Sequence, residues 1–380
     1  MKHGWDYKKL GELVQVLNGY AFKSSLYENQ GIRVLRITNV QKGNIVDDDP
    51  KYYPLSLTDE IRNYLLKESD LLMSLTGNVG RVGLLTKEML PAALNQRVAC
   101  LRILSNGLNL GFLFHYLNSD KFEQDAVLSA KGIAQKNMST EWLKDYKLPL
   151  PPISVQQSIV SELDKINELI RLKKEQLKDY DNLAQSIFYE MFGDEKYERR
   201  KLKDIVKVKS GQVSPLEDPY CDMVHVGPAN IESNTGRLIN LKTAKEENLI
   251  SGKYLFDSSM VLYSKIRPNL NKVTIADFEG ICSADMYPLI PSKSIDKKFL
   301  LFILKQKEFL SYAIANSGRA NIPKINREDL LEYSTILPPL SLQLQFAERL
   351  ALIEKQKEQI SSIIKDLETL LASRMQYWFD

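Results

Sequence analysis

Residues 148–192 read LPLPPISVQQSIVSELDKINELIRLKKEQLKDYDNLAQSIFYEMF, and this stretch decides the fold. The prolines at 151 and 152 end whatever precedes them, because proline can neither continue a helix nor lie in a central strand. Ser154 follows, and a serine side chain can accept hydrogen bonds from the first free N–H groups of a helix. We therefore expect a helix with Ser154 as its N-cap.

Apolar residues along this stretch are spaced alternately four and three residues apart. They are Ile159, Leu163, Ile166, Ile170, Leu177, Tyr180, Ala184, Ile187 and Met191. A period of 3.5 residues that holds over about five heptads is typical of a coiled coil. A helix of about 38 residues would be roughly 57 Å long at 1.5 Å per residue.

A second copy of the pattern opens with ILPPLSLQLQ at Ile336, and Ser341 is its expected N-cap. Its apolar frame is Phe346, Leu350, Ile353, Ile360, Ile364, Leu367, Leu371 and Trp378. We expect the two helices to form an antiparallel pair within the chain. The alternative is that each helix lies on its own domain, but an ordinary globular helix averages only about 11–12 residues. Each frame contains one lysine, Lys173 or Lys357, and a polar core residue can fix the register of a coiled coil.

The whole chain repeats itself. LGELVQVLNG from Leu10 matches LKDIVKVKSG from Leu202 at an offset of 192, and the stretches from Tyr64 and Tyr254 match at 190. From residue 143 onward the offset is 187, so that Pro151, Gln156 and Phe192 correspond to Pro338, Gln343 and Phe379. Such a register over the chain indicates a tandem duplication.

The part of each repeat before the prolines mixes short strands, short helices and loops, which predicts an α+β domain. Expected strands are 34–40, 70–77, 97–104, 223–227 and 259–266, and expected short helices are 111–117 and 298–304. The sequence thus predicts two globular domains, 1–152 and 196–339, each followed by a helical segment, 153–195 and 340–380. A pseudo-twofold symmetric molecule is expected.

Charge is distributed unevenly between these segments. Residues 1–152 carry a net +3 and residues 196–339 a net +5, whereas the helical segments carry −4 and −1. Mildly basic domains are compatible with a surface that binds phosphates, although a chance imbalance of a few charges would look the same. The chain has no run of about 18 apolar residues and no apolar stretch after its first charges, so we expect a cytoplasmic protein without a membrane segment.

Sequence patterns for DNA chemistry are missing. Asp218-Pro219-Tyr220 resembles the turn of an adenine methyltransferase but lacks its second proline, and Gly77, Gly80 and Gly83 do not have the spacing of a cofactor loop. There is no ATP-binding G-x-x-x-x-G-K-[ST] sequence and no Pro-Asp pair of the kind that opens a nuclease metal site. The three cysteines and three histidines show no metal-ligand spacing. We therefore expect a protein that is not an enzyme and holds no metal.

The chain contains a domain, a proline pair and a long helix, and this order occurs twice. In this organisation it resembles the specificity subunit of type I restriction–modification enzymes. The strings LLMSLTGNVGRVGLL and VLYSKIRPNLNKV, the two proline openings, and the endings QSIFYEMFGD and ASRMQYWFD carry the resemblance. It implies that each domain reads one half of a split double-stranded DNA target and that the helices separate the domains. It also implies two methyltransferase subunits as partners, which restriction subunits can join. S-adenosylmethionine, ATP and Mg would then belong to the partners.

Candidate DNA-binding residues lie on polar loops that follow the repeated strand and on two further polar segments. Cations suit phosphate and guanine, and Asn or Gln suits adenine. In the first repeat these residues are Ser74, Thr76, Asn78, Arg81, Asn95, Gln96, Arg97, Lys131, Gln135, Lys136 and Asn137. In the second repeat they are Ser264, Lys265, Arg267, Asn269, Asn271, Lys272, Arg319, Asn321 and Lys324. Because KGIAQKNMS and GRANIPKIN differ at most positions, we expect the two domains to read different sequences.

Two other functions fit parts of the sequence. A coiled-coil scaffold without a DNA role would explain the helices, and a self-contained DNA-modifying enzyme would explain basic domains. Salt-dependent DNA binding argues against the first, and lack of methylation by the chain alone argues against the second.

Overall fold

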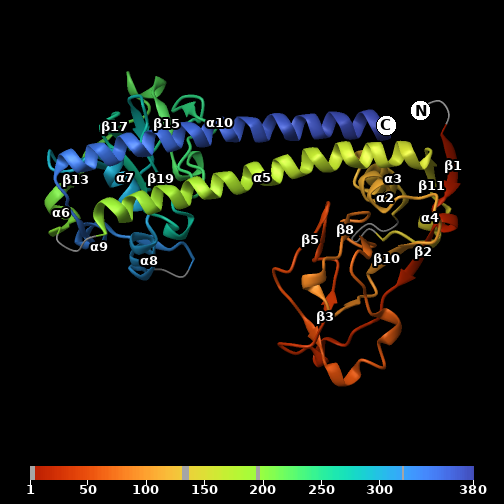
Figure 1. The fold of residues 1–380 in the computed structure, drawn as a ribbon. Coiled ribbons are helices and arrows are strands. Elements are labelled where there is room, and N and C mark those ends of the chain that lie inside the picture. The colour runs from red at the N-terminus through yellow and green to blue at the C-terminus, as the bar shows by residue number, and fades with distance from the viewer. Residues whose placement is uncertain (1–4, 131–136, 194–196, 319–320) are drawn as a thin grey trace. The chain divides into compact units, whose positions relative to one another are not determined.

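The computed structural model describes residues 5–130, 137–193, 197–318 and 321–380, and one order of elements occurs twice along them (Figure 1). The first repeat, residues 1–193, has strands β1 Asp6–Lys9, β2 Val14–Asn18, β3 Ile32–Leu35, β4 Val40–Gln41, β5 Asn44–Ile45, β6 Tyr52–Tyr53, β7 Leu71–Ser74, β8 Val82–Leu84, β9 Ala92–Leu94, β10 Val98–Ile103 and β11 Lys147–Leu150. Its helices are α1 Leu10–Leu13, α2 Leu110–Leu117, α3 Asp120–Ser129, α4 Thr140–Asp145 and α5 Ile153–Phe192.

The second repeat, residues 194–380, has a matching set. Its strands are β12 Arg199–Lys201, β13 Val206–Val208, β14 Gln212–Val213, β15 Val224–Val226, β16 Lys242–Thr243, β17 Lys253–Phe256, β18 Val261–Ser264, β19 Val273–Thr274, β20 Gly280–Cys282, β21 Met286–Pro291, β22 Ser317–Gly318, β23 Lys324–Ile325 and β24 Ser334–Ile336. Its helices are α6 Leu202–Ile205, α7 Lys297–Lys305, α8 Lys307–Ala315, α9 Arg327–Glu332 and α10 Leu340–Phe379.

Sheet topology confirms the duplication. An antiparallel sheet of order β2-β10-β7-β8 in the first repeat corresponds to β13-β21-β18-β19 in the second. The order β6-β3-β9, with β3 and β9 parallel, recurs as β16-β15-β20 inside a five-stranded sheet. The pair β1-β11 recurs as β12-β24. Both domains are therefore α+β and share one topology.

One expected strand is wrong in extent. The segment 34–40 was predicted as a single strand, but β3 ends at Leu35 and a turn follows. The turn forms because the buried side chain of Asn39 accepts a hydrogen bond from Arg36 N (2.9 Å) and donates one to Val46 O (2.9 Å). An asparagine that bonds nearby backbone competes with a sheet ladder in this way. The other expected strands contain β7, β10, β15 and β18, and the expected short helices are α2 and α7.

The two long helices have 40 residues each, but the predicted N-caps are wrong. Helix α5 begins at Ile153, so Ser154 lies inside its first turn, and Ser341 lies inside α10 in the same way. The carbonyl groups of Pro152 and Pro339 accept the first helical hydrogen bonds, from Gln156 N (3.1 Å) and Gln343 N (3.2 Å). Pro152 and Pro339 thus occupy the N-cap positions, where the carbonyl group of the residue accepts the first intrahelical hydrogen bond.

Contacts divide the chain into two compact units, and each unit holds one globular domain with part of both long helices. Unit 1 is residues 1–175 with 361–380, and unit 2 is residues 176–360. In unit 1, α5 and α10 are joined by ion pairs of Lys174 with Glu368 (2.8 Å) and of Arg374 with Glu162. From the pair of Glu162 to the pair of Lys174, the residue number rises along α5, from 162 to 174, and falls along α10, from 374 to 368. The two helices are therefore antiparallel, as the sequence predicts.

Unit 2 continues this pattern with a lysine of the predicted apolar frame. Lys357 of α10 bonds to Asp181 of α5 at 2.8 Å and to Glu354 of its own helix at 3.2 Å. The lysine side chain remains 25% exposed, so its stem covers apolar surface while its ammonium stays paired and partly hydrated. This agrees with a lysine that sets register by pairing with a partner.

Each globular core is completed by the end of the long helix of the other repeat. Phe379, at the end of α10, is 7% exposed and packs edge-on against Phe112 (5.8 Å between ring centroids) and Tyr116 (5.5 Å) of α2. Its counterpart Phe192, at the end of α5, packs in the same way against Phe299 (5.2 Å) of the second domain. Neither repeat, therefore, buries its own core alone.

Truncation of Phe379 tests this dependence. Phe379→Ala should lower the free energy of unfolding of unit 1 by about 3 kcal/mol, because a buried aromatic side chain leaves a cavity. Tryptophan fluorescence during guanidinium unfolding measures unit 1 alone, since Trp5, Trp142 and Trp378 all lie there. Gln376→Ala, an exposed change one turn earlier, is the control. Equal midpoints for the two variants would contradict the packing role.

Candidate DNA interface

The loop between β7 and β8, residues 75–81, is held in shape by its own first strand. The buried hydroxyl of Ser74 donates to Asn78 O and accepts from Arg81 N (3.2 Å). Gly77 and Gly80 both have positive φ, and a Cβ on Gly80 would lie 2.8 Å from Ala126 Cβ. Only glycine adopts this conformation without strain. Ser74 thus acts inside the loop rather than on its surface.

Backbone hydrogen bonds bring the other predicted segments of the first repeat to this loop. Leu75 N donates to Arg97 O (2.9 Å), and Met138 N donates to Leu75 O (2.9 Å). Thr76 forms a β-bridge with Asn137. Residues far apart in sequence therefore line one surface. Lys131, Gln135 and Lys136 lie outside the described residues.

The side chains at this surface differ in their exposure and in their hydrogen bonds. Asn78, Gln96, Arg97 and Asn137 are exposed. Asn95 stabilises a turn, because its Oδ1 accepts from Arg97 N (3.2 Å). Thr76 is buried, and its hydroxyl has no hydrogen-bond partner among the described residues.

The equivalent loop of the second repeat, residues 265–272 between β18 and β19, has an unusual backbone. Arg267 and Asn271 both adopt the left-handed conformation, with φ of 48° and 47°. The turn is closed by Leu270 N, which donates to Arg267 O (2.9 Å), and by Ser264 N, which donates to Lys272 O (3.0 Å). A left-handed arginine is uncommon and marks a backbone that its surroundings impose.

This loop also meets the other predicted segment of its repeat. Arg267 N donates to Pro323 O (2.7 Å), and Ile325 N donates to Lys265 O (3.0 Å). Asn321 and Lys324 therefore lie beside the loop, with Asn321 exposed. Arg319 lies outside the described residues. Both repeats thus place the two predicted segments side by side.

Several of the predicted cationic and amide side chains form hydrogen bonds that stabilise the loop. The ammonium of Lys265 donates to Ala284 O and lies 5.3 Å from the ring centroid of Tyr287. Burial lowers the pKa of Lys265, and the nearby ammonium of Lys324 lowers it further. Lys272 Nζ donates to Pro228 O (2.7 Å), and Asn271 Nδ2 donates to Lys305 O (3.3 Å). Arg267 and Asn269, in contrast, are exposed.

A polar hairpin borders the β7-β8 loop and the β18-β19 loop, and neither hairpin was predicted from the sequence. In the first repeat, the hairpin β4-β5 packs on β8 through Gly43 N and Val82 O (2.9 Å). Its Gln41 Oε1 accepts from Arg81 Nη1 at 2.6 Å, which fixes the predicted arginine. In the second repeat, Asn234 N of the hairpin 231–238 donates to Leu270 O (3.3 Å).

A match at an offset of 191 could have revealed these hairpins. Asn39 and Asn230 are both buried, and each begins its hairpin by bonding backbone on either side. Asn230 Oδ1 accepts from Gly227 N (2.9 Å), and its Nδ2 donates to Asn240 O (3.1 Å). The offset lies between the values of 192 and 190 that frame it.

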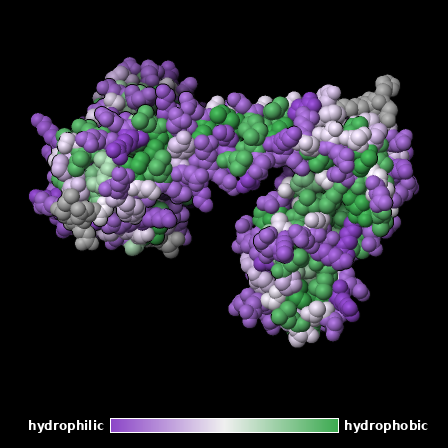
Figure 2. All heavy atoms as spheres, viewed as in Figure 1, coloured by the Kyte–Doolittle hydropathy of each residue, from purple (hydrophilic) through white to green (hydrophobic). Residues whose placement is uncertain are grey.

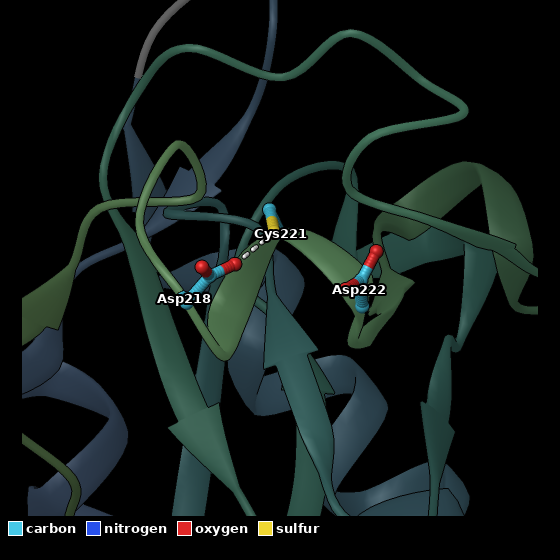
Figure 3. A group of neighbouring side chains, drawn as sticks. All are labelled: Asp218, Cys221 and Asp222. Carbon is cyan, nitrogen blue, oxygen red and sulfur yellow. Dashed lines mark hydrogen bonds between the residues drawn. The ribbon is translucent and has the colours of Figure 1, made fainter.

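Asp218, Cys221 and Asp222 form a separate cluster, with one potential ligand atom from each within 4.8 Å of the others (Figure 3). The thiol of Cys221 donates to Asp218 Oδ1 at 3.0 Å. This hydrogen bond, together with burial, raises the pKa of Cys221. The two carboxylates are exposed, and exposed acidic groups commonly lie together without an ion.

In the loop of the second repeat, we expect Lys265 to stabilise the loop and Arg267 to have no such role. Lys265→Ala should speed hydrogen exchange at the amides of Arg267 and Ile325, because the loop loses its anchor to Ala284. Arg267→Gly should leave that exchange unchanged, since glycine accepts the left-handed backbone. Hydrogen exchange followed by mass spectrometry measures both. Faster exchange in the Arg267 variant than in the Lys265 variant would reverse these roles.

Comparison with known proteins finds one family model twice on this chain. The model, described as type I restriction modification DNA specificity domain, matches residues 2–179 and again residues 194–369. The two matches fall on the two repeats. No helix in the described part of the chain is long and apolar enough to cross a membrane.

Individual relatives agree with this match. The type I restriction enzyme EcoDI specificity subunit of Escherichia coli is 38% identical over 149 residues, 39% of this chain. The chain spans only about a third of that relative's length, 33%. The putative type I restriction enzyme MjaX specificity subunit of Methanocaldococcus jannaschii is 23% identical over 401 residues, which cover 97% of this chain and 92% of that protein.

A solved structure shares the fold. The crystal structure of a type I restriction–modification S subunit from M. genitalium superposes with a TM-score of 0.57 at 14% identity, and the match covers 100% of this chain and 98% of that one. With a family match in each repeat and the duplicated topology described above, the chain belongs to the type I restriction–modification DNA specificity family.

Proposed function

We propose that this chain is the specificity subunit of a type I restriction–modification system, a protein without catalysis of its own that reads a bipartite DNA sequence. The observation that carries the proposal is the repeated surface. Each family-matched domain brings the same two polar segments together, through backbone hydrogen bonds between equivalent loops, and presents different side chains on them.

The division of labour follows the repeat. Residues 1–152 and 196–339 act as target-recognition domains, and residues 153–195 and 340–380 act as spacers. Because the two surfaces expose different residues, the half-sites differ. The first offers Asn78, Gln96, Arg97 and Asn137, and the second offers Arg267, Asn269 and Asn321.

Exposed arginine and amide side chains suit direct reading of bases. Arginine can bind the major-groove edge of guanine with two hydrogen bonds, and asparagine or glutamine can bind adenine in the same manner. Lys324 and Arg81 are half-buried cations, and their charges suit phosphate contacts. The modest net charge of each domain fits a small number of phosphate contacts.

DNA binding by Arg267 variants tests the surface. Arg267→Gly keeps the backbone conformation but should weaken binding of the cognate DNA by about 1–3 kcal/mol and relax the preference for one base. Lys324→Ala should instead weaken binding to all sequences and lower the salt slope by about one unit. Lys207→Ala, an exposed cation on β13, is the control. Unchanged affinity in both loop variants would remove this surface from the DNA interface.

Partner subunits supply the chemistry in this proposal. Two methyltransferase subunits bind the chain and methylate adenine with S-adenosylmethionine, and restriction subunits that use ATP and Mg can join them. The complex works in the cytoplasm. The long helices provide a docking surface, because they expose hydrophobic residues to solvent (Figure 2). The exposed leucines and isoleucines are Ile153, Leu169, Leu172, Ile363 and Leu370 in unit 1, and Leu183, Leu340, Leu344 and Leu352 in unit 2.

Leu352, which is 67% exposed, gives the clearest test of this docking. Leu352→Lys should leave the chain folded and able to bind DNA but weaken its association with the methyltransferase subunit, measured by co-purification. Gln345→Lys adds the same charge to an exposed polar position of α10 and should leave association intact. If both variants assemble normally, the partner binds elsewhere.

Length is the controlling variable if the helices act as spacers. Inserting seven residues after Glu175 in α5 and seven after Ile360 in α10 preserves the heptad pattern. Each helix then becomes about 10 Å longer at 1.5 Å per residue. The half-sites should move apart by about three base pairs of roughly 3.4 Å each, with unchanged half-site sequences. A variant that methylates with the original spacing would show that these helices do not set the distance.

A further inference from the structure

At the start of each long helix, one buried glutamine forms hydrogen bonds through both its amide oxygen and its amide nitrogen. Gln156, in the first turn of α5, is fully buried. Its Oε1 accepts from Asn109 N at 2.8 Å, and its Nε2 donates to Gly107 O at 2.9 Å and to Pro151 O at 2.8 Å. One amide thereby ties the helix to the loop that precedes α2.

The second repeat contains the same arrangement, with every partner at the offset of 187. Gln343 is fully buried, its Oε1 accepts from Asp296 N at 2.8 Å, and its Nε2 donates to Ser294 O at 3.0 Å and to Pro338 O at 2.8 Å. We call Gln156 and Gln343 the glutamine latches. All of their partners are backbone groups, so the latches survive changes of neighbouring side chains.

The surrounding contacts between domain and helix have diverged. In the first repeat, His115 of α2 bonds to Asp164 of α5 at 2.7 Å. The counterparts of these two residues are Phe302 and Ala351, and Phe302 instead packs on Phe346 of α10 at 4.8 Å. This contact has thus changed from polar to apolar, while the latch has kept its geometry.

Each latch also acts on the element that carries the domain core. Asn109 and Asp296 are the N-caps of α2 and α7, and their side chains accept from Phe112 N (3.1 Å) and Phe299 N (3.0 Å). A latch therefore connects the first turn of a long helix with the N-cap residue of the domain helix beside it. Apolar contacts alone would tolerate small rotations, whereas hydrogen bonds weaken steeply outside a narrow range of distance and angle.

We propose that Gln156 and Gln343 are positioning residues that hold each recognition domain in one orientation on the long helix that follows it. In a bipartite reader, this orientation limits which spacer lengths both domains can engage. The latches are therefore determinants of spacer precision, a role that rests on the function proposed above.

Distance measurements within unit 1 test the orientation without any DNA. Spin labels are attached through Lys87→Cys in the domain and Ser161→Cys in α5, in a Cys221→Ser background, because both label positions are exposed. Gln156→Glu keeps the shape of the side chain but loses both donors, so the distribution of label distances should broaden. Gln157→Glu makes the same chemical change at the exposed neighbouring position and should leave the distribution narrow.

Loss of stability must be separated from loss of orientation. Ile61→Ala removes a fully buried side chain from a core cluster of the domain that does not include α5, and so lowers stability without touching the latch. At temperatures where all variants are folded, only the latch variant should broaden the distances. If Gln156→Glu does not fold, Gln156→Met and the equivalent Gln343→Glu with labels in unit 2 replace it. Equal broadening in the Ile61 and latch variants, or a narrow distribution in every latch variant, would overturn the proposal.

The assembled methyltransferase complex provides the functional readout. Methylation is measured on DNA substrates whose spacer is correct, one base pair shorter or one base pair longer. In Gln156→Glu and Gln343→Glu, discrimination against the wrong spacers should fall by about tenfold, the scale on which one buried hydrogen bond acts. Gln157→Glu and Gln345→Glu should keep it. Unchanged discrimination in both latch variants contradicts the proposal, whereas absence of any bipartite methylation by the unmodified complex contradicts the proposed function instead.

Discussion

The structure depends on one packing constraint, the completion of each globular core by the far end of the other repeat's helix. Phe379 fills the first core and Phe192 the second, and both are nearly buried. Burial of one aromatic side chain is worth several kcal/mol, a large share of the stability of an ordinary domain. The antiparallel course of α5 and α10 follows from it, because each helix has to start on its own domain and end on the other. The ion pairs between the helices then select the register within each unit.

Duplication explains how one protein can keep a common frame while the side chains that it exposes differ between the two domains. The frame consists of backbone groups, buried amides and ring contacts that recur at fixed offsets, as with Gln156 and Gln343 or Asn39 and Asn230. The loops around residues 75–81 and 265–272 are connected to their neighbours through backbone hydrogen bonds, and Lys265, Asn271 and Lys272 add side-chain hydrogen bonds. Asn78, Arg267 and Asn269 are exposed. Substitution at Asn78 or Arg267 therefore alters the surface at little cost to the fold.

The sequence predicted the features that depend on periodicity and repetition. The proline pairs and the 3.5-residue period together located both long helices, and the drifting offsets revealed two copies of one fold. It failed where a single hydrogen bond decided the outcome. Ser154 and Ser341 were predicted as N-caps, but the helices begin earlier and the prolines Pro152 and Pro339 occupy those positions. Asn39 interrupted an expected strand. The hydrogen bond between Gln156 and Asn109 joins residues that are 47 positions apart, and such a bond produces no local sequence pattern from which it could be predicted. For the same reason the sequence could not separate Lys265, which anchors its loop, from the exposed Arg267.

In the proposed function, one chain reads two half-sites at a fixed separation. A map of methylated adenines in DNA modified by this chain together with a methyltransferase subunit tests this function directly. We expect a single motif with two different half-sites and a spacer of constant length. A continuous methylated motif, or half-sites modified independently of each other at variable separations, would contradict it.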